Sequence, residues 1–149
     1  AAGPFAAAVQ VAGYEDALRS WREGKKEEAL ATFMAVDFTR RPLFPKGSPL
    51  GYSERDYVAL PRAVNDKLQP QIIEETKRMK GLAVSVKEAA TRASQRGDVP
   101  QAERYLKQLK QCGEALAHPD SLALLQMVGK AFTRLATNPP SSSPAPSPR

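Results

Sequence analysis

The stretch "ASQRGDVPQAERYL", Ala93 to Leu106, decides which fold is predicted for this chain. It has two interpretations. Either Arg96-Gly97-Asp98 is a cell-adhesion tripeptide displayed on a loop, or Gly97 and Asp98 form a tight turn between two packed helices. Glycine readily adopts the left-handed conformation that ends a helix. We predict the turn, because it gives both residues a structural role.

Regularly spaced small and apolar residues on both sides of this turn predict two helices. In the segment before the turn these residues recur every seven positions. In the segment after the turn they recur at alternating intervals of four and three. Because the two seams match, we expect each helix to supply the core of the other. Small residues in the second seam would let a neighbouring helix approach closely. The seam residues are Ile72, Met79, Val86 and Ala93, and then Ala102, Leu106, Leu109, Gly113 and Leu116.

A second stretch, "WREGKKEEALATF" at residues 21–33, repeats the pattern around the turn. In both stretches a glycine is followed by an alanine after five residues and by a large apolar residue after four more. The pattern predicts two antiparallel helices that are joined by a short turn and packed closely where the side chains are small. It occurs at Gly24, Ala29 and Phe33, and again at Gly97, Ala102 and Leu106.

The order of a small residue, a turn glycine, an alanine and a large apolar residue resembles the helix-turn-helix unit of tetratricopeptide repeats. The resemblance covers two separated units of the chain. It implies an all-α fold of antiparallel helical hairpins, in a right-handed array or an irregular bundle. It also implies a role in protein–protein interaction without intrinsic catalysis. A regular groove for peptides would need several stacked units, which the sequence does not show.

The composition along the chain predicts one helical domain and a tail. Residues 1–137 form the domain, with a first helical hairpin at 5–36 and central and C-terminal helices at 53–137. Between them, residues 37–52 are rich in proline and glycine but also apolar, so we expect a long irregular loop packed on the helices. It either covers the core or binds a partner. Residues 138–149, rich in proline and serine, are expected to form a disordered tail.

Helix signals in the second half of the domain come mainly from proline and serine. Ser53 is a natural N-cap for a short helix. The long helix before Gly97 is expected to begin as early as Pro61 and to kink at Pro70, or else to break near Leu68. A final helix is expected to start near Pro119.

Residues that could support catalysis are few in this sequence. Cys112 and His118 are the only cysteine and the only histidine. Cys112 falls on the apolar side of a predicted helix, so we expect a buried free thiol, and His118 precedes a helix entry. Adjacent glutamates on a helix point in different directions, and the glycines are too scattered to form a phosphate-binding loop. We therefore predict a non-enzyme without catalytic residues, cofactor or metal.

Charge and hydropathy do not identify the cellular compartment of the protein. The net charge is +6, but basic residues alternate with glutamates, as is usual on a solvated helix surface. No apolar run is long enough to cross a bilayer, so we expect a soluble protein. The sequence does not begin with methionine, so we expect that an N-terminal segment has been removed, and an exported mature form fits this pattern.

Two binding functions remain as hypotheses. The first is a scaffold or protein-interaction module, whose aromatic anchors would be Trp21, Phe38, Phe44 and Tyr52. The alternative is electrostatic binding of nucleic acid or another polyanion through Lys77, Lys80, Arg92, Lys107 and Lys110. Self-association through an incompletely covered seam is a third hypothesis. The sequence does not identify the partner.

Overall fold

The structure is a computed structural model that describes residues 13–40, 43–45 and 48–137. The predicted all-α class is confirmed, and the described residues contain no strand. The first hairpin is α2 (Tyr14–Arg22) and α3 (Lys26–Ala35), followed by a 3-10 turn, η1 (Pro49–Gly51). Then come α4 (Glu54–Val58), α5 (Arg62–Gln95), α6 (Val99–Leu116) and α7 (Ala123–Thr137). The predictions for residues 5–12 and for the tail at 138–149 fall outside the described residues.

The two glycine turns have the same backbone geometry, as the repeated pattern predicts. Gly24 has a φ of 83° and Gly97 a φ of 84°. The residue after each glycine donates a backbone hydrogen bond to a carbonyl five residues earlier, Lys25 to Ser20 at 2.9 Å and Asp98 to Ala93 at 2.8 Å. Together with the positive φ, these bonds form a Schellman motif that ends α2 and α5.

Asp98 also has a structural role in its turn. Its carboxylate accepts a hydrogen bond from the backbone N–H of Gln101, 3.3 Å away, and thereby caps the start of α6. The predicted turn at Gly97 and Asp98 is therefore confirmed.

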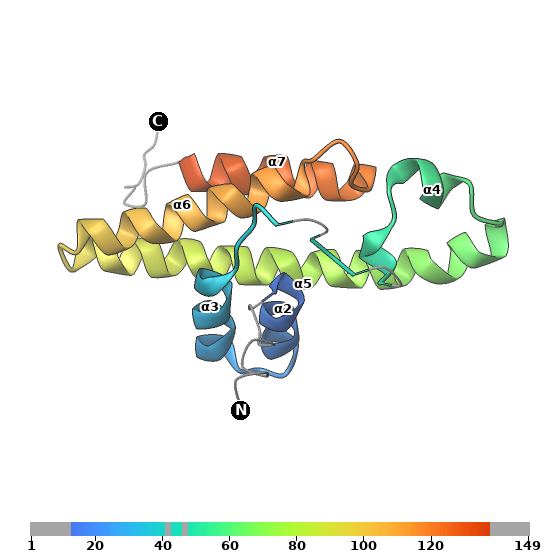
Figure 1. Cartoon of the computed structure of the whole chain (residues 1–149). Coiled ribbons are helices and arrows are strands. Elements are labelled where there is room, and N and C mark those ends of the chain that lie inside the picture. Colours follow the sequence, from blue (N-terminus) through green and yellow to red (C-terminus); the bar gives the residue numbers. More distant parts are fainter. Residues whose placement is uncertain (1–12, 41–42, 46–47, 138–149) are drawn as a thin grey trace, which may run out of the picture.

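Helix α5 is the spine of the molecule, and the other helices are arranged along it (Figure 1). It runs for 34 residues and continues through Pro70, so the alternative of a break near Leu68 is wrong. Pro70 is exposed, and water can therefore satisfy the carbonyl that loses its helical partner. Before Ile72 no residue of α5 is buried, and Val64 is 38 % exposed. The buried part of α5 therefore begins at Ile72, where the predicted seam begins.

The predicted seams form the core between α5, α6 and α7. Met79, Val86 and Leu109 have no exposed surface, and only Leu106 among the predicted seam residues is more than slightly exposed. Helices α6 and α7 approach most closely at two glycines. A Cβ added at Gly113 would lie 2.6 Å from the carbonyl oxygen of Gly129. The prediction that a small residue at position 113 allows close helix packing is confirmed.

The short hairpin of α2 and α3 projects from one side of α5 (Figure 1). An aromatic cluster joins the two helices of the hairpin to the loop that follows them. The ring of Tyr14 lies 6.1 Å from that of Phe33, 5.3 Å from that of Phe38 and 5.8 Å from that of Phe44, measured between centroids. The side-chain amide of Gln108 on α6 donates to the carbonyls of Phe33, at 2.8 Å, and Val36, at 2.7 Å. These bonds tie the end of α3 to α6.

The described residues of the loop at 37–52 include several that pack on the helices, as predicted, but they are not entirely irregular. Residues Pro49–Gly51 form the 3-10 turn, which the Ser48 hydroxyl caps by accepting a hydrogen bond from the N–H of Leu50. Phe38 is 4 % exposed and Phe44 is 5 % exposed. Both side chains fill the core beneath the loop, so in this fold they offer little surface to a partner.

Candidate interaction surface

Of the four predicted aromatic anchors, Trp21 and Tyr52 remain partly accessible. Tyr52 is half-buried beside Tyr57, with 6.5 Å between the ring centroids. Trp21 is half-buried at the end of α2, where the helix meets the outer face of α5. Because Phe38 and Phe44 belong to the core, only Trp21 and Tyr52 among the predicted anchors have surface to offer a partner.

A glycine on α5 allows the Trp21 indole to lie against the helix backbone. A Cβ added at Gly81 would lie 2.9 Å from Cζ2 of Trp21, so any larger residue would push the ring away. On the hairpin side, the Lys26 ammonium lies 5.2 Å from the centroid of the ring, a cation–π distance. The indole is thus fixed between α5 and the start of α3.

Beside this ring lies an open groove of about 420 Å³, which we call the Trp21 groove. Its apolar part consists of the indole edge, the Gly81 backbone and Val84, whose side chain is 48 % exposed. Charged and polar residues border it, namely Lys26, Lys80, Ser85 and Glu88. An apolar floor with a charged rim matches the composition of sites that bind one segment of another protein.

Sequence reasoning found Trp21 and Lys80 but missed Gly81 and Val84. The available signal was the glycine inside a helical pattern, since a glycine there weakens the helix and often marks a close approach. Which segment makes that approach depends on where the α2–α3 hairpin crosses α5. Local spacing carries no information about that crossing.

The one cysteine is buried and unreactive in this fold. Cys112 is fully buried, as predicted, and its side chain interacts with that of Tyr14. Burial raises the pKa of the Cys112 thiol to about 12, so it is protonated at neutral pH and is a poor nucleophile. Burial also raises the pKa of Tyr14 well above its ordinary value. Neither group is available to a substrate at the surface.

The histidine lies apart from this pair, in the turn between α6 and α7. Nδ1 of His118 accepts a hydrogen bond from the backbone N–H of Asp120, 3.0 Å away, so the ring stabilises the turn. Helix α7 begins at Ala123, later than the proline signal suggested, and the Glu54 carboxylate caps it by accepting a hydrogen bond from the Ala123 N–H at 2.8 Å. Within the described ranges, no group of three potential ligands is placed to hold a metal ion.

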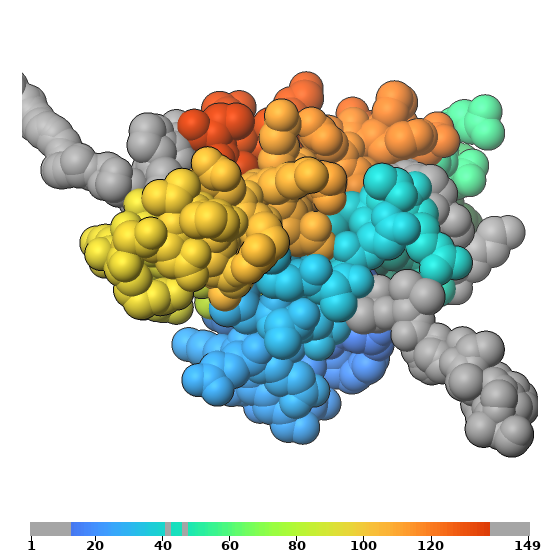
Figure 2. All heavy atoms as spheres, turned by 60° about the vertical axis from the view of Figure 1, so that its left-hand side comes forward, coloured from blue at the N-terminus to red at the C-terminus, as the bar shows by residue number. Residues whose placement is uncertain are grey.

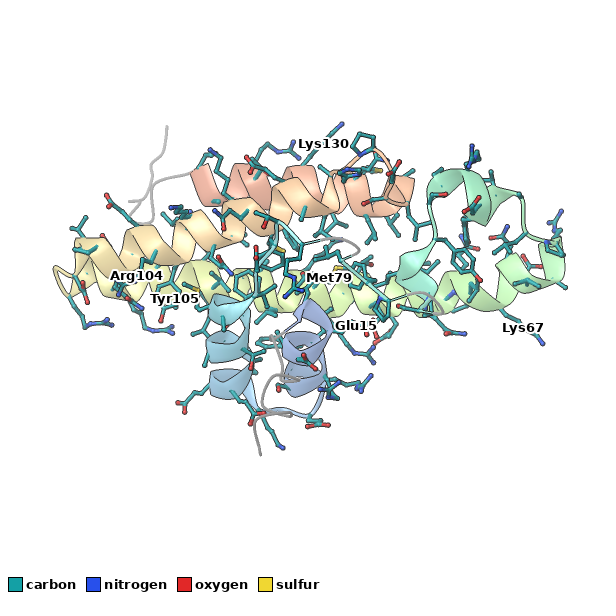
Figure 3. The ribbon with its side chains drawn as sticks, viewed as in Figure 1. Glu15, Lys67, Met79, Arg104, Tyr105 and Lys130 are labelled. Carbon is teal, nitrogen blue, oxygen red and sulfur yellow. The ribbon has the colours of Figure 1, made fainter. Side chains whose placement is uncertain are left out.

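The five residues of the polyanion hypothesis do not form one face. Lys77 and Lys80 lie on the exposed side of α5, and Lys107 and Lys110 on the exposed side of α6. These four side chains are thus divided between two helices. Basic residues elsewhere are also spread out, with Lys67 and Lys130 on different sides of the molecule (Figure 3). Exposed carboxylates lie among them, at Glu74, Glu88, Glu103 and Glu114.

No family model, curated protein or solved structure matches this chain in the comparisons with known proteins. Among the residues that the structure describes, no helix combines the length and the apolar character that a membrane span requires.

Proposed function

We propose that this chain is a non-catalytic protein-interaction module that binds a segment of a partner protein in the Trp21 groove. The observation that carries the proposal is the exposed apolar floor made by the Trp21 indole, the Gly81 backbone and Val84. A tryptophan held in place by packing loses little entropy on binding, and tryptophan is enriched among the residues that dominate interface energies.

The surroundings of the floor support the same function. The fixed indole and the glycine beneath it form a preformed hollow, so a partner need not open the fold to enter. The charged rim of Lys26, Lys80 and Glu88 can orient a partner without being buried.

Site-specific cross-linking tests this function. The variant Ser85→Cys places a thiol at the edge of the groove, and the native Cys112 is too buried to compete for a maleimide photo-cross-linker. We expect ultraviolet light to join the labelled protein to a discrete partner in extracts of the producing cells. Adding Val84→Asp should remove that product, because it places a charge on the apolar floor.

The matched control is Met127→Asp on α7, which changes another exposed apolar residue, 67 % exposed, in the same way. It should leave the cross-linked product unchanged. Products that are equally abundant with and without Val84→Asp would contradict a function at this groove.

A further inference from the structure

Three arginines lie beyond the Trp21 groove, at the tip of the α5–α6 hairpin. Arg92 follows Ser85 by seven residues, so it lies on the face of α5 that borders the groove, and Arg96 is one turn further along. Arg104 is one turn before Gln108, whose amide reaches the end of α3. All three arginines therefore belong to the side of the tip that faces the α2–α3 hairpin, and we call them the tip arginines.

The pictures agree with this placement. Arg104 and Tyr105 extend from α6 toward the side on which α2 and α3 project (Figure 3). The tip lies at the end of α5, further along that helix than the place where the α2–α3 hairpin projects (Figure 1, Figure 2). The tip itself has a small core of Ala90, Ala93 and Ala102, with Tyr105 and Leu106 packed against it.

The tip arginines are exposed, and none of them forms an ion pair with a described residue. Arg19 and Arg78 differ in this respect, because each pairs with a carboxylate of its own helix. Arg104 donates a hydrogen bond to a neutral group, the side-chain oxygen of Gln101. Three guanidinium groups on one side without a carboxylate partner make a surface that is complementary to an anion.

We propose that the tip arginines extend the Trp21 groove and that its occupant is an acidic amphipathic helix of a partner protein. This inference rests on the proposed function. An apolar residue of the partner helix would fill the hollow beside Trp21, and carboxylates further along would reach the arginines. Gly81 and Arg92 are 11 residues apart on α5, so the anchor and the carboxylates should be separated by about 16 Å, or roughly three helical turns.

The chemistry of the surface favours carboxylates on a protein over nucleic acid. A guanidinium group binds a carboxylate through two parallel hydrogen bonds, which gives direction as well as affinity. Binding of single-stranded nucleic acid relies on exposed aromatic rings along the basic surface. Here the tip offers one aromatic residue, Tyr105, which is half-buried.

Trp21 is the only tryptophan in the chain, so its fluorescence reports directly on the groove. The probe is a synthetic helical peptide of about 20 residues, with a leucine pair as anchor and a glutamate cluster placed roughly three turns later. A second peptide of the same composition has its glutamates directly beside the leucines. We expect the first peptide to shift the Trp21 emission and to bind at least about ten-fold more tightly than the second.

A charge-reversal variant tests the arginines. Replacing Arg92, Arg96 and Arg104 by glutamate should weaken the first peptide at least about ten-fold and reduce the salt dependence of its binding. The control replaces Lys67, Lys110 and Lys130, which are exposed elsewhere, by glutamate. It changes the net charge equally and should leave the affinity nearly unchanged. Circular dichroism of both variants confirms that the helices remain.

The outcomes separate this inference from the function on which it rests. If Val84→Asp abolishes peptide binding but the tip variant binds as tightly as its control, the acidic partner is refuted and the groove remains. If neither peptide changes the Trp21 emission, the proposal is wrong, since the probe contains the chemistry that it specifies. If a single-stranded oligonucleotide binds more tightly than the peptide and only the tip variant loses it, the arginines serve nucleic acid instead.

Discussion

Replacing Gly113 by alanine tests the close approach of α6 and α7. The added Cβ would lie 2.6 Å from the Gly129 carbonyl oxygen, and 2.6 Å and 2.9 Å from the hydroxyl oxygen and backbone nitrogen of Thr133. Two of these three atoms belong to the backbone of α7, so the helices must separate to admit a methyl group. Overpacking of this kind costs about 3 kcal/mol at the upper end of its usual range. Alanine returns about 1 kcal/mol through its higher helix propensity.

We therefore expect Gly113→Ala to lower the free energy of unfolding by about 2 kcal/mol, which corresponds to a decrease in Tm of roughly 4 to 8 °C. Urea unfolding followed by circular dichroism measures the first quantity, and a thermal scan the second. Gly81→Ala is the matched control, since the three atoms nearest to its Cβ belong to the Trp21 side chain and none of them to a helix backbone. Its stability should change by less than about 1 kcal/mol. A Gly113→Ala protein as stable as the wild type would refute the observed crossing of α6 and α7.

Further predictions concern the turns, the tie between α3 and α6, and the buried thiol. Gly24→Ala and Gly97→Ala should each destabilise the protein by about 1 to 2 kcal/mol in urea unfolding, because both glycines have a positive φ; a neutral effect at either would contradict the shared turn geometry. Gln108→Ala should cost about 1 to 3 kcal/mol, since two carbonyls lose their donor, and unchanged stability would show that water replaces the amide. Folding raises the pKa values of Tyr14 and Cys112, so the unfolded state releases protons first. The free energy of unfolding should then be unaffected by these groups at neutral pH and fall as the pH rises from about 9 toward 12, with a shallower fall in Cys112→Ala; an equal slope in both proteins would contradict it.

The features that sequence alone predicted are those set by local spacing. The turns at Gly24 and Gly97 follow from one residue with a left-handed backbone, and the seam from Ile72 to Ala93 follows from helical periodicity. Both are properties of a few consecutive turns of chain, so distant packing changes them little.

The features that sequence missed depend on which segments meet. Phe38 and Phe44 lie in a loop rich in proline and glycine. The local sequence is compatible both with a loop that covers the core and with a loop that presents aromatic residues to a partner. Their burial follows from the position of Tyr14 on another element. The Trp21 groove likewise exists because one hairpin crosses α5 at Gly81. Only the tertiary structure therefore shows which of the four aromatic candidates are buried and which are accessible.

The hydrogen bonds of Gln108 to the end of α3 join residues that are 75 and 72 positions apart in the chain. During synthesis, the first hairpin leaves the ribosome several seconds before this glutamine is translated. The carbonyls of Phe33 and Val36 are therefore hydrated until α6 has formed and packed against α3. Such distant contacts slow folding, because the intervening chain must be ordered before they form. The α2–α3 hairpin is thus the first part of the described chain to be made and one of the last to be completed.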